Sequence, residues 1–177
     1  MKVNEILIDE KAIVDKVQAL ADEINQKHRG EKLIVIGVLK GCFVFLSDLV
    51  RRLDCDVQVY FMEVSSYGDG TESSGVLKIK KDLDIDIKGE KVLIAEDIID
   101  SGFTLSKLVK NLKERQPASL EICAFLSKPD RRKVSIEADF TGFEIPDKFV
   151  VGYGLDCAEQ YRQLPYIGVV ECDDAAL

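Results

Sequence analysis

Histidine is the scarcest of the residues that commonly carry catalytic or metal chemistry in this chain. The 177 residues include a single histidine, His28, which excludes any site built from several histidine ligands. Its neighbours from Asn25 to Gly30 are polar, so we expect His28 at a solvated helix end rather than as a catalytic base. The chemistry must therefore come from carboxylates, lysines and glycine-rich turns.

Paired cysteines and long apolar runs are also missing. The five cysteines are odd in number and none forms a Cys-x-x-Cys pair, which argues against a disulfide framework or a zinc site and favours reduced thiols. No apolar run approaches the ~20 residues of a membrane span, and the start of the chain has no apolar signal-peptide stretch. We expect a cytoplasmic protein with no membrane partner.

Positive charge is in the minority. Lysine and arginine number 24 against 32 aspartates and glutamates, a formal net charge of −8. An acidic protein repels a polyphosphate backbone, so we expect no nucleic-acid partner. The length and the 46% hydrophobic content suit one domain spanning residues 1–177.

The apolar residues switch between two patterns along the chain. Helical spacing recurs at 13–24, 42–53 and 105–112, and short apolar or alternating runs occur at 33–39, 57–61, 92–95, 120–126, 149–153 and 167–170. Strands that alternate with helices predict an α/β fold, with a mostly parallel sheet and helices on both faces.

One segment, residues 65–75, lacks any apolar periodicity. It is dominated by serine and glycine, with Tyr67 among them. A long connection of this kind is either a mobile lid or an ordinary surface loop. Composition alone favours the surface loop, whereas a lone aromatic favours a lid that covers something.

Carboxylates follow the apolar strand 92–95 directly. Glu96 and Asp97 come at its end, Asp100 follows, and the segment 101–104 (Ser-Gly-Phe-Thr) then opens a helix. In parallel sheets ligands bind beyond the carboxyl ends of strands. Carboxylates can hold a diol or a hydrated cation, and a glycine turn at a helix N-terminus can hold a phosphate, so a sugar phosphate satisfies both. The alternative is that Asp100 and Ser101 merely cap the helix.

Residues 96–104 resemble the phosphoribosyl-pyrophosphate signature of the type I phosphoribosyltransferases. Further matches, in family order, narrow the resemblance to hypoxanthine-guanine phosphoribosyltransferases: 39–41 (Leu-Lys-Gly), 66–68 (Ser-Tyr-Gly), 127–129 (Ser-Lys-Pro), 147–156 and 161–162 (Tyr-Arg). The resemblance implies the type I fold: a mostly parallel sheet flanked by helices, a small hood formed by the terminal segments, and a flexible lid loop. The peptide that matches Leu39-Lys40 is often cis in this family.

The resemblance also implies the residues that bind phosphoribosyl pyrophosphate. They are Lys40, Gly41, Glu96, Asp97, Ser101, Gly102, Phe103, Thr104 and Arg162. Of these, Glu96 and Asp97 would hold the ribose hydroxyls and the amides of 101–104 the 5′-phosphate. Lys40 and Arg162 would hold the pyrophosphate.

The implied catalytic and base-binding residues complete the site. Asp100 would assist deprotonation of the base, and Ser66 and Tyr67 would form the lid. Lys128, Phe149, Val150 and Asp156 would contact the purine, with Lys128 donating to its oxo group. Asp156, Glu96 and Asp97 are the expected ligands of a Mg²⁺ cofactor. A donor at the oxo position favours 6-oxopurines over adenine, whose amino group would face another donor.

The expected reaction is purine salvage: hypoxanthine or guanine plus phosphoribosyl pyrophosphate gives the nucleoside monophosphate and pyrophosphate. Two alternatives remain open, namely a preference for xanthine and a non-catalytic regulator of the same fold that senses phosphoribosyl pyrophosphate. The family commonly assembles, so a homodimer or homotetramer is expected.

Overall fold

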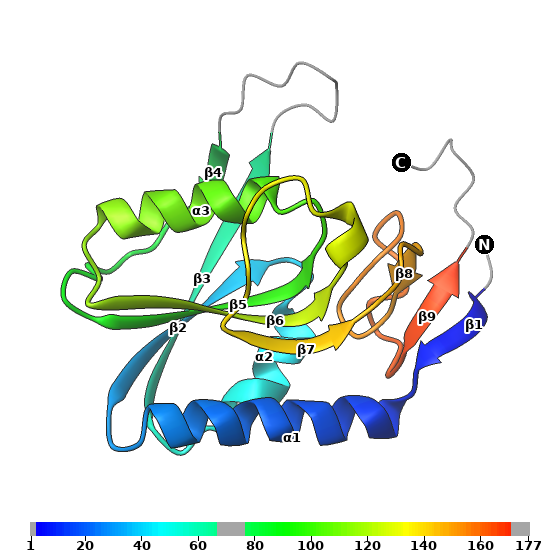
Figure 1. Cartoon of the computed structure of the whole chain (residues 1–177), viewed down its shortest axis with the longest axis horizontal. Coiled ribbons are helices and arrows are strands. Elements are labelled where there is room, and N and C mark those ends of the chain that lie inside the picture. Colours follow the sequence, from blue (N-terminus) through cyan, green and yellow to red (C-terminus); the bar gives the residue numbers. More distant parts are fainter. Residues whose placement is uncertain (1–2, 67–76, 171–177) are drawn as a thin grey trace.

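The computed structural model describes residues 3–66 and 77–170 and contains two sheets (Figure 1). The helices are α1 (Glu10–Lys27), α2 (Phe43–Val50) and α3 (Phe103–Glu114), with one 3-10 turn at Pro129–Arg131. The strands are β1 (Val3–Ile8), β2 (Lys32–Leu39), β3 (Asp56–Ser66), β4 (Leu77–Lys81), β5 (Lys91–Ile99), β6 (Ser119–Ser127), β7 (Phe140–Glu144), β8 (Val150–Val151) and β9 (Ile167–Val170).

The larger sheet has the strand order β4-β3-β2-β5-β6-β7. All neighbouring pairs in it are parallel except β3 and β4, which pair antiparallel. Helices α1 and α2 cover one face and α3 covers the other (Figure 1). The predicted α/β class, the mostly parallel sheet and the placement of helices on both faces are confirmed.

A separate hydrophobic core lies on each face of the larger sheet. Leu33 and Val35 of β2 pack in the core beneath α1 and α2, whereas Ile34 and Ile36 pack in the core beneath α3. Both faces of the strand are thus buried, which explains why its sequence is apolar without alternation. In the core beneath α1 and α2, the ring centroids of Phe45 and Phe125 lie 5.2 Å apart.

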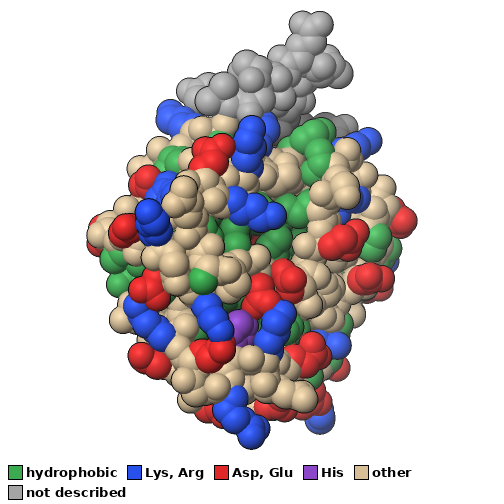
Figure 2. All heavy atoms as spheres, turned by 60° about the vertical axis from the view of Figure 1, so that its left-hand side comes forward, with side chains coloured by type: hydrophobic (Ala, Val, Ile, Leu, Met, Phe, Trp, Pro, Cys, Tyr) green, Lys and Arg blue, Asp and Glu red, His purple; other side chains and the backbone are tan. Residues whose placement is uncertain are grey.

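His28 is buried, so the prediction of a solvated position was wrong. It caps the C-terminus of α1 and is 3% exposed. Its Nε2 lies 2.7 Å from an oxygen of Glu121 on β6, and its Nδ1 lies 3.2 Å from an oxygen of Glu31. Figure 2 shows the ring in purple between acidic and basic side chains. One of the polar neighbours that suggested exposure, Lys27, also pairs with Glu121. His28 lines neither of the two cavities described below.

Three strands were not predicted: β1, β4 and β7. β1 pairs antiparallel with β9, which also pairs with β8, and these three form the smaller sheet at one end of the molecule (Figure 1). β8 is shorter than the predicted strand 149–153, and β5 extends further, to Ile99. None of the helices in the described part of the chain is long and apolar enough to cross a membrane.

Candidate active site

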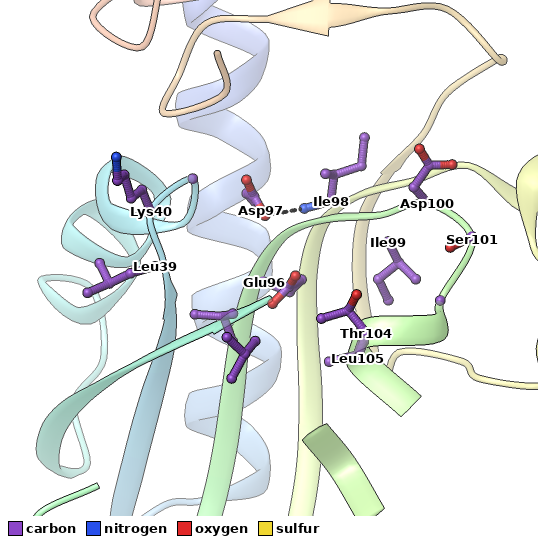
Figure 3. Close-up of a pocket in the computed structure, with 14 residues that line it drawn as sticks. Leu39, Lys40, Glu96, Asp97, Ile98, Ile99, Asp100, Ser101, Thr104 and Leu105 are labelled. Carbon is purple, nitrogen blue, oxygen red and sulfur yellow. Dashed lines mark hydrogen bonds between the residues drawn. The ribbon is translucent and has the colours of Figure 1, made fainter. Parts of the chain in front are cut away.

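The carboxyl ends of β2 and β5 form a cavity of about 280 Å³. β5 carries Glu96 and Asp97 into this cavity, and Asp100 and Ser101 follow in the turn that leads to α3. Figure 3 shows these side chains spaced along the end of the strand, with Thr104 beside them. The cavity occupies the position where parallel sheets bind ligands.

Glu96 and Asp97 are held in an environment that disfavours their charge. Burial raises the pKa of Asp97 to about 6, although hydrogen bonds from backbone amides and the nearby Arg162 act in the opposite direction. The Oδ1 of Asp97 accepts a 2.9 Å hydrogen bond from the Ile98 amide. Burial, and then the neighbouring Asp97, raise the pKa of Glu96 well above its ordinary value. The buried Oε2 of Glu96 receives no hydrogen bond from the described residues. Hydrogen-bond donors such as the hydroxyls of a sugar would stabilise the charged forms of Glu96 and Asp97.

Gly41 allows the Asp97 carboxylate to lie against the loop that follows β2. A Cβ at this position would be 1.6 Å from the Asp97 Oδ2, so any larger residue would displace the carboxylate or the loop. The preceding Leu39–Lys40 peptide is cis, as it often is in the family that the sequence resembles. The predicted pair Lys40 and Gly41 therefore lies beside Glu96 and Asp97 at the same cavity.

The turn before α3 is the segment for which the sequence predicted an anion cradle, and it lines the first cavity. Gly102 has φ +83°, a left-handed conformation that suits glycine, and it stands at the N-terminus of the 12-residue helix. Ser101, Gly102 and Thr104 line the cavity. Phe103 does not line the cavity, and the residue is 47% exposed. Phe103 can therefore contact a ligand in this cavity through its backbone amide and not through its ring. The prediction that the amides of 101–104 hold the 5′-phosphate needs only the backbone. Free amides at a helix N-terminus favour phosphate.

A second cavity, of about 480 Å³, adjoins the first. It is lined by all four residues that the sequence assigned to the purine, Lys128, Phe149, Val150 and Asp156. The two cavities share Ile98, Asp100 and Ser101. Asp100 therefore stands where a ligand in one cavity would meet a ligand in the other.

Lys128 is a buried cation in this second cavity. The residue is 5% exposed, and its amide donates a 2.9 Å hydrogen bond to the Ile99 carbonyl at the end of β5. This backbone bond joins the residue after β6 to the last residue of β5. Lys128 and Asp100 both line the second cavity.

Two further charged residues line this cavity, Arg131 and Asp147. The sequence assigned no role to either, although the matched segment 147–156 begins at Asp147. The Nε of Arg131 lies 2.7 Å from the Asp100 Oδ1, and its Nη1 lies 3.3 Å from an oxygen of Asp147. The same Asp147 oxygen is 3.9 Å from the Lys128 Nζ. Arg131 sits in the charged run 130–133, which by composition is a solvated surface turn, and no local signal marks its contact with Asp100.

Lys40 and Arg162, the predicted pyrophosphate ligands, are brought together by a third residue, Glu159. Its Oε1 lies 2.8 Å from the Lys40 Nζ, and its Oε2 lies 3.2 Å from the Arg162 Nη2. The same Arg162 nitrogen lies 2.9 Å from the Asp156 Oδ1. Glu159 was not among the residues chosen from the sequence.

The expected metal ligands do not form a closed cage. Glu96 and Asp97 line the first cavity and Asp156 lines the second. Within residues 3–66 and 77–170, no three histidine, cysteine or acidic side chains are grouped so that they could hold a metal ion. Mg²⁺ usually takes one or two carboxylates and completes its shell with water and phosphate oxygens. The donor set fits an ion that arrives with a polyphosphate.

The predicted lid falls largely outside the described residues. β3 ends at Ser66, and Tyr67 belongs to the segment 67–76, which is not described. The roles of Ser66 and Tyr67 therefore stay predictions.

Comparison with known proteins agrees with this geometry. Residues 3–158 match the model of the phosphoribosyl transferase domain family. The chain is 50% identical over 169 residues to a hypoxanthine-guanine phosphoribosyltransferase of Bacillus subtilis, covering 96% of this chain and 94% of the relative. It is 48% identical over 168 residues to a hypoxanthine phosphoribosyltransferase of Escherichia coli, with 94% of both chains covered.

Solved structures give the same result. A crystal structure of a hypoxanthine-guanine phosphoribosyltransferase from Bacillus anthracis superposes with a TM-score of 0.92 at 47% identity, covering 96% of this chain and 100% of the other. A hypoxanthine phosphoribosyltransferase from Staphylococcus aureus gives 0.92 at 46% identity, with 96% and 92% covered. The chain therefore belongs to the phosphoribosyl transferase domain family and, within it, to the hypoxanthine-guanine phosphoribosyltransferases.

Proposed function

We propose that this protein transfers the 5-phosphoribosyl group of phosphoribosyl pyrophosphate to hypoxanthine or guanine, giving the nucleoside monophosphate and pyrophosphate. The observation that carries the proposal is the pair of adjoining cavities that share Asp100. One cavity combines carboxylates with a helix N-terminus and suits a sugar phosphate. The other combines an aromatic ring with a buried cation and suits an oxopurine.

The first cavity positions the sugar. Glu96 and Asp97 accept hydrogen bonds from the ribose hydroxyls, which compensates the burial of these carboxylates. The backbone amides around Gly102 and the hydroxyls of Ser101 and Thr104 hold the 5′-phosphate. Catalysis depends mainly on holding the anomeric carbon of the sugar against the base.

The second cavity selects the base. The Lys128 ammonium donates a hydrogen bond to the 6-oxo group, the ring of Phe149 stacks on the purine, and the backbone of Val150 contacts its edge. Because adenine has an amino group at this position, it would leave two buried donors without acceptors, which discriminates strongly against it.

Asp100 receives the proton. As a ring nitrogen of the base bonds to the anomeric carbon, the bond to the pyrophosphate oxygen breaks, and the imidazole proton of the base passes to the Asp100 carboxylate. Asp100 lines both cavities and is therefore placed to accept this proton. In the free protein this carboxylate is paired with Arg131, whose Nε lies 2.7 Å from the Asp100 Oδ1.

We include a Mg²⁺ cofactor in the proposal, with Asp156, Glu96 and Asp97 as candidate ligands beside the pyrophosphate. When bound, the ion would neutralise charge on the leaving group. Lys40 and Arg162 supply positive charge from the protein at the same place. A lid formed by Ser66 and Tyr67 would exclude water that could hydrolyse the activated sugar. The cytoplasmic location and a homodimeric or homotetrameric state stay predictions.

The test is turnover. The protein is mixed with phosphoribosyl pyrophosphate, Mg²⁺ and each of hypoxanthine, guanine, xanthine and adenine in turn, and base conversion is followed by absorbance. We expect turnover with hypoxanthine or guanine and essentially none with adenine. Faster turnover with xanthine than with the other bases would establish the xanthine-preferring alternative. Binding of phosphoribosyl pyrophosphate with no turnover of any base would support the non-catalytic regulator, for which a gel shift with DNA at physiological salt is the second assay.

A further inference from the structure

One acidic side chain stands among the cations assigned to the pyrophosphate. Glu159 is exposed, yet its carboxylate bridges Lys40 at 2.8 Å and Arg162 at 3.2 Å. Lys40 follows β2, whereas Arg162 lies 122 positions later in the loop after β8, so the carboxylate joins two distant segments. Two carboxylate oxygens between two cations reproduce the contacts that a phosphoryl group would make.

The backbone is shaped to present this carboxylate. Cys157 and Gln160 exchange backbone hydrogen bonds of 3.2 and 3.1 Å around a two-residue turn. Both residues of the turn, Ala158 and Glu159, adopt left-handed conformations, with φ +51° and +62°. Such conformations are unfavourable for residues other than glycine and concentrate at functional sites. The Glu159 amide also donates to the Asp156 Oδ2 at 2.9 Å, which fixes the turn against a cavity residue.

The arginine is fixed from the other side. Its Nη1 donates a 2.9 Å hydrogen bond to the Gly154 carbonyl, while its Nη2 is shared between Asp156 and Glu159. Gly154 itself packs against the loop that carries Lys40: a Cβ there would lie 2.1 Å from the Gly41 carbonyl oxygen. The two loops therefore touch.

We propose that the Glu159 carboxylate acts as an internal substitute for the pyrophosphate, bridging Lys40 and Arg162 in the free protein and leaving them when phosphoribosyl pyrophosphate binds. This inference rests on the proposed function, which assigns Lys40 and Arg162 to the pyrophosphate. The carboxylate keeps the two cations in place and competes with the anionic ligand. It therefore weakens pyrophosphate binding and favours release of this product.

The experiment compares wild type with Glu159→Gln in the full chain. The dissociation constant for inorganic pyrophosphate is measured by calorimetry with and without Mg²⁺, and that for the nucleoside monophosphate of hypoxanthine is measured in parallel. We expect Glu159→Gln to bind pyrophosphate roughly three- to tenfold more tightly, which matches the modest strength of exposed ion pairs. The nucleoside monophosphate, which lacks the pyrophosphate, should bind with unchanged affinity. Damage to the turn would weaken binding, so a gain in affinity cannot come from a merely structural role.

Two further variants sharpen the test. Glu90→Gln removes the same charge from an ion pair of 2.8 Å with Lys32, at the opposite end of the parallel strands, and should leave pyrophosphate affinity unchanged. Glu159→Asp keeps the charge on a shorter side chain and should fall between wild type and Glu159→Gln.

Three outcomes would contradict the account. Unchanged or weaker pyrophosphate binding by Glu159→Gln, with turnover retained, overturns the role of Glu159 and leaves the proposed function intact. An equal gain for Glu90→Gln overturns it as well, because the effect would then be one of net charge. A wild-type protein that neither binds phosphoribosyl pyrophosphate nor turns over any base overturns the proposed function itself.

Discussion

Replacing Asp97 by asparagine should make the free protein more stable at neutral pH. Burial raises the pKa of this carboxyl from its ordinary value of 3.8 to about 6, so the folded protein binds its proton more tightly than the unfolded chain does. The penalty for the buried charge is fully present above about pH 6 and is relieved as the pH falls toward 3.8. Asparagine avoids the charge and keeps an oxygen that can accept the 2.9 Å hydrogen bond from the Ile98 amide.

The magnitude follows from the shift. A rise in the pKa of Asp97 from 3.8 to about 6 corresponds to about 3 kcal/mol of unfolding free energy, so we expect a gain of about 1–3 kcal/mol at pH 8. The same variant should bind phosphoribosyl pyrophosphate more weakly, because the charged acceptor for the ribose hydroxyls is gone. Stability and function would then change in opposite directions at one residue.

The assay is urea unfolding of wild type and Asp97→Asn at pH values from 8 to 4, without divalent cations or ligands. The gain should be largest at pH 8 and should fade between pH 6 and pH 4. Asp54→Asn serves as the control, because Asp54 is exposed and lies outside both cavities. A variant that is no more stable than wild type at pH 8, or whose gain is independent of pH, would refute the argument.

Three other substitutions have defined outcomes. Gly41→Ala places a Cβ 1.6 Å from the Asp97 carboxylate and should raise the KM for phosphoribosyl pyrophosphate by about tenfold or more. In the control Gly89→Ala the added Cβ would meet nothing within 4 Å, so the KM should be unchanged. Equal KM values for the two variants in initial-rate assays would contradict this prediction. His28→Gln leaves the buried Glu121 with fewer partners and should lower the free energy of unfolding in urea by about 2–3 kcal/mol. Turnover per folded molecule should be unchanged. A decrease below about 0.5 kcal/mol would contradict this prediction. Phe125→Ala removes a fully packed ring and should cost about 3–5 kcal/mol in the same assay; a cost below about 1 kcal/mol would show that the core refills the space.

The sequence predicted the central elements because their signals are local. β2 is buried on both faces, so its apolar run is unbroken, and the acidic residues after β5 stand out against the buried strand that precedes them. β1 and β4 lie at sheet edges. β1 does not alternate regularly, and β4 does alternate apolar residues with lysines but over only five residues, which is a short signal. β7 is short and contains a glycine at which a Cβ would lie 2.3 Å from the Phe125 carbonyl oxygen.

In the site, too, residues that belong to a local motif could be predicted from the sequence, whereas contacts between distant loops could not. Residues 96–104 and their family resemblance indicated the cavity at the end of β5, and the base-binding assignments fall in the adjoining cavity. The contacts of Arg131 with Asp100 and of Glu159 with Lys40 depend on loops that meet only in the folded chain. A charged residue in a polar stretch of sequence is normally predicted to lie on the surface, and the same holds for His28. No spacing rule along the sequence would have found these three.

The central claim is that Asp100 acts at the junction of the two cavities, and a single-turnover measurement of Asp100→Asn tests it most directly. Phosphoribosyl pyrophosphate is bound first, its dissociation constant is measured by calorimetry, and conversion of hypoxanthine is then followed after rapid mixing. We predict a dissociation constant within about threefold of wild type and a rate of conversion lower by about 10²–10³-fold, the usual contribution of a positioned proton acceptor. A wild-type rate, or a loss of phosphoribosyl pyrophosphate binding as large as the loss of rate, would contradict the account.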